Sequence, residues 1–331
     1  NMLDRTYLKH IQNSKLLGNS SKQIYLSRLE VIKNDIWKNC KSMNHKVGKG
    51  KCLNYIIKHP DVFMEKMDEF VNKTGGRLDK NKLSMHAKDG YVSAIGAIFR
   101  HTPGMIQKQS ELYQKWMELH SEVRQPINEK YQSNKPNERQ EKAYVSFDEV
   151  EKIRNKLEDG TIDKLLLSMY TMIPPVRNDY YKTAIYKNES EISNNIDNYL
   201  IMNTKTYINL RKYKTSKTYK DNKFYLPKEL VKQIKLSLDK NPRDFLFVSP
   251  RNNEPYKSNT FNRWANRTLK KIFDKDNFSL TTLRHIYITR RDLKLEEKSG
   301  LERNKIAKVM GHSVGTQQNY LWHTYEKENK N

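Results

Sequence analysis

Residues 281–289 read TTLRHIYIT and residues 309–320 read VMGHSVGTQQNY, and these two stretches decide how the chain is interpreted. The first contains Arg284 within an apolar pattern that is typical of a helix. The second has a Gly-His-Ser turn at His312 and ends eight residues later at Tyr320. Taken singly, such a His is usually a cap or turn residue, and such a Tyr usually packs in a core or lies on the surface. The stretches become informative only together with residues further upstream.

Two basic residues upstream complete the pattern. Arg177 lies in PPVRNDYY, directly after a predicted helix that must end at the two prolines. Lys214 lies in YKTSK, at the end of a predicted strand. Each of these residues alone is usually a solvated or salt-bridged surface charge. The ordered set along the chain is Arg177, Lys214, Arg284, His312 and Tyr320.

This ordered set resembles the catalytic domain of the tyrosine recombinases, the family of phage-type integrases. Its members have an Arg after a helix, a Lys in a β-hairpin, an LRHxxxT string, an LGHS-like string and a Tyr eight or nine residues later. Here residues 283–289 fit the first string, residues 309–313 fit the second, and Tyr320 takes the last position. The resemblance covers roughly residues 144–331, and residues 1–125 are similar to the family's core-binding domain only in their helical pattern.

The resemblance implies a chemistry for each residue of the set. Arg177 and Arg284 would bind the non-bridging oxygens of a phosphodiester, where negative charge grows in the transition state, and His312 would hydrogen-bond the same phosphate. Tyr320 would be the nucleophile and would form a 3′-phosphotyrosyl link with release of a 5′-hydroxyl. Lys214 would protonate the leaving oxygen. No cofactor or metal is expected in this mechanism.

Two of these assignments have an alternative. Lys217 begins a second Lys-Thr pair three residues after Lys214, so it is the other candidate for the general acid. Tyr325 is the other candidate for the nucleophile. Five residues on a helix correspond to a rotation of ~140°, so Tyr320 and Tyr325 are not expected to face the same phosphate.

The sequence departs from the family pattern at two positions. Thr281 stands where the family has the first His of its HxxR motif, and a Thr can donate a hydrogen bond but cannot act as a base near neutral pH. Removal of the tyrosine proton would then rest on His285, His312, water or the substrate. Many members also have a Glu three residues after the first Arg, whereas here Asp179 follows Arg177 by two residues. Either Asp179 orients Arg177 instead, or the local structure differs from that of the family.

The composition favours a nucleic-acid partner. Among 331 residues, 62 Lys and Arg outnumber 38 Asp and Glu, which gives a formal net charge of +24. The mean hydropathy is −0.93 and no apolar run has the length of a membrane span. Cys40 and Cys52 are too few for a disulfide framework, so a reducing compartment, cytoplasmic or nuclear, is expected.

The chain is predicted to be mainly α-helical with two domains. Residues 1–125 are expected to form a helical DNA-binding domain without strands, in which residues 72–77 (NKTGGR) form a loop. Residues 126–143 are polar, contain two prolines and are expected to be an extended linker. Residues 144–331 are expected to be a mainly helical catalytic domain with a small three-stranded antiparallel sheet. Its strands are predicted at residues 199–202, 207–210 (continuing toward Lys214) and 224–226. One helix is predicted to follow Ser146, and others at residues 162–172, 228–238, 258–273, 281–293, 302–310 and 316–325.

Double-stranded DNA is the expected partner, and the resemblance implies a homotetramer that acts on two duplexes. Phosphate contacts rather than base contacts are expected from Lys257, Arg263, Arg267 and Lys270. The sequence therefore predicts a site-specific recombinase or integrase of a virus or mobile element. Two alternatives stay open. One is a type IB topoisomerase or telomere-resolving enzyme with the same chemistry, and the other is an inactive DNA-binding protein, which only Thr281 favours.

Overall fold

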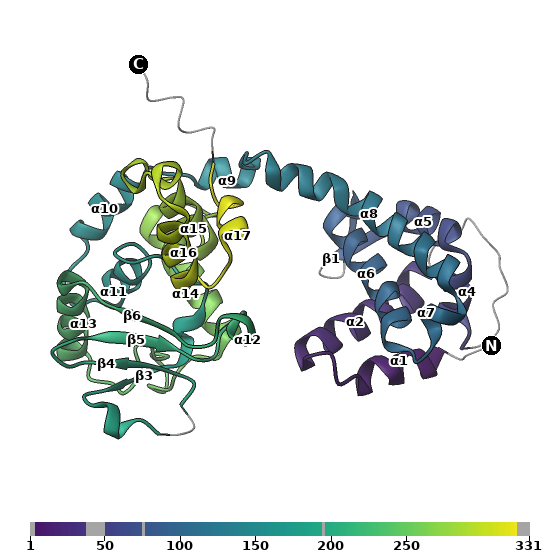
Figure 1. The fold of residues 1–331 in the computed structure, drawn as a ribbon. Coiled ribbons are helices and arrows are strands. Elements are labelled where there is room, and N and C mark those ends of the chain that lie inside the picture. Colours follow the sequence, from purple (N-terminus) through teal and green to yellow (C-terminus); the bar gives the residue numbers. More distant parts are fainter. Residues whose placement is uncertain (1–3, 38–49, 75–76, 194–195, 323–331) are drawn as a thin grey trace, which may run out of the picture. The chain divides into compact units, whose positions relative to one another are not determined.

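The computed structural model describes residues 4–37, 50–74, 77–193 and 196–322. The chain divides into two compact units, residues 1–132 and residues 133–331 (Figure 1). Both are mainly helical, and a small sheet belongs to the second unit, so the predicted fold class is confirmed.

The first unit is built around one apolar helix. This helix is α6 (Met85–His101), and it packs against α1 (Asp4–Asn13), α2 (Asn19–Val31) and α8 (Ser110–Gln132). Along α6 the buried side chains include Val92, Ile95, Ile98 and Phe99, a spacing of three and four residues that keeps one face in the core. Among the described residues, the other helices of this unit are η1 (Ile32–Ile36), α4 (Cys52–Lys58), α5 (Pro60–Glu69) and α7 (Met105–Lys108).

Two predictions for the first half of the chain are wrong. The segment read as a loop is a hairpin, because β1 (Val71–Thr74) pairs antiparallel with β2 (Arg77–Lys82). Two glycines separate these runs in the sequence, which is a typical hairpin signal that the polar flanking residues obscure. The predicted extended linker is largely helical, since α8 continues to Gln132 and α9 (Glu138–Ala143) begins with a capping box. Val123 and Ile127 extend the buried face of α8 past the point at which Pro126 had suggested its end.

The helices of the second unit include those predicted, α14 at its predicted bounds and the others with shifted ends. They are α10 (Phe147–Lys156), α11 (Ile162–Met169), the short α12 (Ser216–Tyr219), α13 (Lys228–Lys240), α14 (Ser258–Phe273), α15 (Leu280–Thr289), α16 (Gly300–Val309) and α17 (Val314–Gln318). Single 3-10 turns are η2 (Asp179–Lys182), η3 (Glu189–Glu191), η4 (Arg291–Leu293) and η5 (Leu295–Glu297). Every residue of α15 from Thr282 to Thr289 is buried, so this helix forms the centre of the unit.

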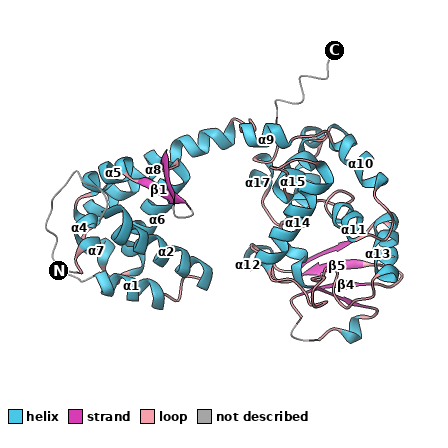
Figure 2. Ribbon diagram, turned by 180° about the vertical axis from the view of Figure 1, so that it is seen from behind, coloured by secondary structure: helices cyan, strands magenta, loops and turns pink. Residues whose placement is uncertain are grey.

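The sheet of the second unit is mixed and has four strands rather than three antiparallel ones. Its order is β3 (Thr183–Tyr186), β4 (Asn198–Ile201), β5 (Tyr207–Leu210) and β6 (Asn222–Tyr225), with β3 parallel to β4 and the other pairs antiparallel. The additional strand, β3, also bonds a distant segment, because the amide of Ile185 donates to the carbonyl of Asp244. Such long-range pairing leaves no local signal in the sequence. In both views α12 lies at one end of the sheet and α13 at the other (Figures 1 and 2).

We predict that Gly160→Ala lowers the free energy of unfolding by about 1–3 kcal/mol, because it places a side chain at a positive φ against backbone. Gly160 has φ +76°, and an added Cβ would lie 2.8 Å from the carbonyl oxygen of Leu236 on α13. The matched control is Gly300→Ala, since an added Cβ at Gly300 has nothing within 4 Å. Urea unfolding should show a loss for the first variant and none for the second; equal effects would contradict the argument.

Candidate active site

Arg284 lies inside the core of the second unit. Its side chain is 2% exposed, and its Nη1 donates to the carbonyl oxygen of Pro175 at 2.7 Å and to that of Met310 at 3.4 Å. Its Nε is buried and has no hydrogen-bond partner among the described residues. Burial lowers the pKa of Arg284, and the neighbouring Tyr320 raises it. Because a guanidinium stays charged in proteins, this position holds a buried cation with an unused donor.

The turn between α16 and α17 connects the upstream basic residues to this cation. Gly311 has φ +72°, and its carbonyl oxygen accepts from Nη1 of Arg177 at 3.3 Å and from Oγ1 of Thr215 at 2.7 Å. Thr215 belongs to the β5–β6 connection, so this hydrogen bond docks that connection on the turn. Lys214 is exposed next to Thr215, and Lys217 is exposed in α12 of the same connection. Both lysines therefore remain candidates for the general acid. Lys214 lies in a turn, and not at the end of a strand as the sequence predicted.

His312 lies beside Gly311 and is 3% exposed. Its Nδ1 donates to the carbonyl oxygen of Ser313 at 3.0 Å, which leaves Nε2 as an acceptor in the neutral ring. That Nε2 is buried and has no hydrogen-bond partner in the described part of the chain. Burial, together with the positive charges of Arg284 and Arg177, lowers the pKa of His312 to about 4. The ring is consequently neutral near pH 7.

Tyr320 packs against these residues. Its ring stacks on His312 with centroids 5.4 Å apart, and the guanidinium carbon of Arg284 lies 4.7 Å from the ring centroid. The helix predicted over residues 316–325 is too long, because α17 ends at Gln318 and Tyr320 lies in the following turn. Because Tyr320 does not lie on a helix, helical rotation does not separate it from Tyr325, which itself lies outside the described residues.

Tertiary contacts explain why the helix ends early. The amide of Trp322 donates to Oγ1 of Thr289 at 3.1 Å, and the Trp322 side chain is 2% exposed. The chain therefore leaves the helical path to bury this residue against the end of α15. Local propensity in residues 319–322 does not predict such a contact.

His285 has a role in the structure that differs from that of His312. Its Nδ1 donates to the backbone carbonyl of Tyr320 at 3.0 Å, and its ring stacks on Trp322 with centroids 4.1 Å apart. Burial, with a smaller contribution from Arg284, lowers the pKa of His285 to about 4. His285 is thus a neutral group that holds the Tyr320 backbone.

The two positions that depart from the family pattern lie in different environments. Thr281 is exposed on the first turn of α15 and lines a pocket. Asp179 is 8% exposed, and burial raises the pKa of its carboxyl, against the influence of Arg177 and Arg284. The carboxyl accepts a hydrogen bond from the backbone amide of Arg177. Asp179 therefore contacts the Arg177 main chain, whereas the guanidinium of Arg177 bonds the carbonyl of Gly311.

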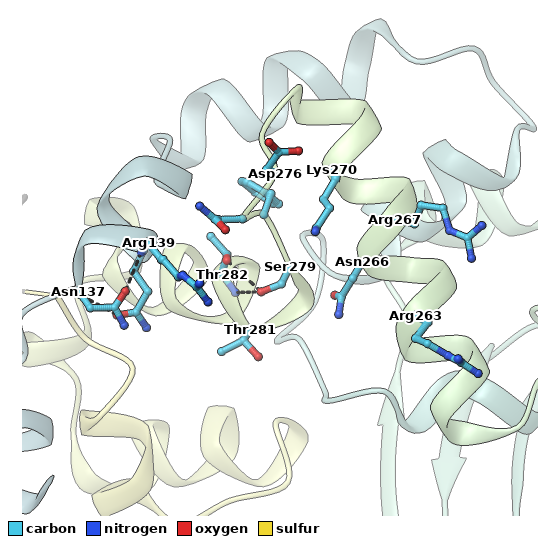
Figure 3. Close-up of a pocket in the computed structure, with 13 residues that line it drawn as sticks. Asn137, Arg139, Arg263, Asn266, Arg267, Lys270, Asp276, Ser279, Thr281 and Thr282 are labelled. Atoms are coloured by element: carbon cyan, nitrogen blue, oxygen red, sulfur yellow. Dashed lines mark hydrogen bonds between the residues drawn. The ribbon is translucent and has the colours of Figure 1, made fainter. Parts of the chain in front are cut away.

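A basic pocket of about 550 Å³ brings together most of the predicted phosphate-contacting residues (Figure 3). Arg263, Arg267 and Lys270 line it from one helix, α14, and Arg139 lines it from α9. Its other lining residues are Asn137, Gln140, Asn266, Asp276, Asn277, Phe278, Ser279, Thr281 and Thr282. Lys257 is exposed at the start of α14 and does not line the pocket. The sequence did not single out Arg139, because it falls in the segment taken as a linker.

Within the described ranges, no three His, Cys, Asp or Glu side chains gather in a way that could hold a metal ion. No helix in the same ranges combines the length and apolarity that crossing a membrane requires.

The comparisons with known proteins give distant similarities among solved structures. No family model matches the chain, and no curated protein matches it. Among solved structures, the chain is similar to the crystal structure of XerA recombinase, with 15% identity and a TM-score of 0.40 over 96% of this chain and 92% of that chain. A similarity of this size assigns no function, which must be argued from the site itself.

We predict that His312 titrates near pH 4 and not near its ordinary value of about 6.5. Between these values the unfolded chain takes up a proton that the folded chain does not, so stability is lost as pH falls through this window. The loss attributable to His312 at pH 5 is about 2 kcal/mol.

Imidazole NMR signals followed between pH 8 and 3.5 give the pKa, and His312→Gln identifies the signal. His86→Gln, at an exposed position, is the control for the assignment and should leave the His312 signal in place. A His312 pKa near 6.5 would mean that the side chain is solvated and that the buried geometry is wrong.

Proposed function

We propose that this protein cleaves and rejoins DNA strands through a 3′-phosphotyrosyl intermediate and acts as a site-specific recombinase. One observation carries the proposal. Nε of Arg284 and Nε2 of His312 are buried polar atoms without partners in the described chain, and both side chains contact the ring of Tyr320. Buried polar groups are normally hydrogen-bonded, so unsatisfied ones beside a nucleophilic side chain favour a bound polar substrate.

The positive charges of Arg284 and Arg177 suit a phosphodiester, which is an anion. Arg284 and Arg177 both bond carbonyls of the Met310–Gly311 turn, which holds two guanidinium groups in one region. A phosphoryl transition state carries more negative charge than its ground state, so fixed cations in a region of low dielectric stabilise it selectively. The buried Arg284 needs no reorganisation when that charge forms.

The remaining groups supply the proton transfers. Oη of Tyr320 would attack phosphorus, the bond between phosphorus and the 5′-oxygen would break, and the tyrosine proton would pass to an acceptor. Nε2 of His312 is the candidate acceptor, because Nδ1 of the same ring already donates to Ser313. Lys214 or Lys217 would give its proton to the departing 5′-oxygen. Attack by a 5′-hydroxyl from another strand would reverse the reaction.

DNA binding is supported by charge at two scales. The net charge of +24 attracts a polyanion over long range, and the pocket on α14 concentrates Arg263, Arg267 and Lys270 beside the start of α15. Because α15 also carries Arg284, a duplex held by this pocket would be positioned relative to the catalytic cation. A tetramer on two duplexes, in whichever compartment holds the DNA, is part of this proposal.

We predict that the protein forms a detergent-resistant adduct with nicked duplexes from its source genome and that Tyr320→Phe abolishes the adduct, because the attacking oxygen is lost. Tyr325→Phe is the matched control and should keep it. Arg177→Ala should slow adduct formation by about 10²–10³-fold, since half of the phosphate clamp is removed. Denaturing gels with labelled DNA give all three results.

The outcomes separate the alternatives. Loss of the adduct only in Tyr325→Phe would move the nucleophile to that residue. Tight DNA binding without any adduct would favour an inactive DNA-binding protein. An adduct that relaxes supercoils but never joins two different duplexes would favour a topoisomerase.

We also predict that Arg263→Ala combined with Arg267→Ala weakens DNA binding about tenfold or more. Each lost phosphate contact should reduce the slope of log affinity against log salt by about 0.9. The control is Lys232→Ala with Lys235→Ala, which removes the same charge from exposed positions on α13. Anisotropy titrations at several salt concentrations measure both quantities, and equal losses in the two double variants would show that the α14 pocket has no special role.

A further inference from the structure

A second basic pocket, of about 680 Å³, lies at the end of the sheet away from the candidate active site. It is formed by the β4–β5 turn, the end of β6 and the first turns of α13. The β5–β6 connection, which docks on Gly311 through Thr215, leaves the opposite end of β5. α12 in that connection and α13 lie at opposite ends of the strands in both views (Figures 1 and 2). The proposed reaction therefore does not use this pocket.

The rim of the pocket is strongly positive. Four of the lining residues are lysines, and none is acidic. The lysines are Lys205, Lys228, Lys232 and Lys235. The other lining residues are Asn203, Thr204, Thr206, Tyr225, Leu226, Val231 and Leu236. All four lysine side chains are exposed, and within the part of the chain that the structure describes none forms a salt bridge. Hydrogen bonds from Lys164 and Gln233 lower the pKa of Asp159, and the positive charge of Lys232 adds to this effect. Four exposed lysines that form no salt bridge among the described residues favour an anionic ligand.

The walls of the pocket are apolar. Leu226, Val231 and Leu236 are half-buried, and Tyr225 is 61% exposed with its ring against that of Tyr207. An exposed aromatic side chain next to half-buried aliphatic ones is the composition of a surface that receives apolar side chains. The volume lies within the range of about 300–1,000 Å³ that ligand pockets usually have.

We propose that this pocket, the α13 pocket, binds an acidic peptide segment of a partner protein, with one or two apolar side chains inserted between its walls. The charge of the rim and the apolar walls together favour this ligand over nucleic acid. A duplex backbone presents phosphates to the lysines but has no apolar group to enter the cavity. Lysines also act here as flexible point charges, whereas the α14 pocket has the planar guanidinium groups that suit phosphate.

The test measures binding of a fluorescein-labelled peptide to the full chain by anisotropy at physiological salt. In the probe, glutamates flank two leucines, and in a companion peptide serines replace the leucines. Lys232→Glu with Lys235→Glu should weaken binding of the leucine probe about tenfold or more, because two attractive charges become repulsive. The matched control is Arg263→Glu with Arg267→Glu on α14, which makes the same change of charge and should alter the affinity less than about twofold.

Three further arms complete the test. The serine peptide should bind about tenfold more weakly than the leucine probe, because burial of the leucines is lost. Tyr225→Ser, at an exposed position, should weaken the leucine probe and leave the serine peptide unchanged. A random-sequence duplex should bind the Lys232→Glu and Lys235→Glu variant within about twofold of the unmodified chain.

Each contrary result overturns the proposal. Equal losses in the two charge-reversal variants would mean general attraction to a basic protein. Equal affinity for the two peptides would mean that the apolar walls take no part. Duplex affinity that falls only in the α13 variant would assign the pocket to nucleic acid, and no detectable binding of the leucine probe would remove the site. DNA cleavage enters none of these measurements, so they stand apart from the recombinase proposal.

Discussion

The carbonyl oxygens of Met310 and Gly311 hold the candidate site together. They accept hydrogen bonds from Arg284, Arg177 and Thr215, which come from three segments far apart in the sequence. The positive φ of Gly311 makes this turn possible, since residues with a side chain rarely adopt that conformation. One glycine thereby brings α15, the segment after α11 and the β5–β6 connection to a common point, and His312 follows directly.

This arrangement is costly for the folded chain. Arg284 is a buried cation with an unsatisfied Nε, His312 has an unsatisfied Nε2, and Gln317 on α17 is fully buried with neither amide atom bonded among the described residues. The apolar side chains of α15, such as Leu283, Ile286 and Ile288, pack on all sides and offset the cost. The unsatisfied atoms of Arg284 and His312 belong to side chains that contact the ring of Tyr320, and such a group fits a site in which stability has been given up for function.

The sequence predicted the helices well where a single apolar face decides them, and less well where distant contacts do. The range of α14 was predicted to the residue from its pattern, because Phe261, Ala265 and Leu269 define one buried stripe. By contrast, β3 depends on pairing with residues near Asp244, and the end of α17 depends on burial of Trp322. The order of motifs singled out Arg177, Arg284 and His312 as candidates, and only the fold shows that they meet at one turn.

The two histidines show what sequence spacing cannot resolve. His285 and His312 were equal candidates for the tyrosine base, and burial lowers the pKa of each to about 4. Their hydrogen bonds separate them. Nδ1 of His285 donates to the carbonyl of Tyr320, and its ring lies flat on Trp322, so the side chain fixes the tyrosine backbone. His312 uses Nδ1 for Ser313 and keeps Nε2 unpartnered beside the tyrosine ring. A neutral imidazole whose acceptor nitrogen is free can receive a proton, and His312 meets this condition. His285 holds the backbone of Tyr320 and need not take up the proton. His312 is therefore the better candidate for the base in the proposed reaction.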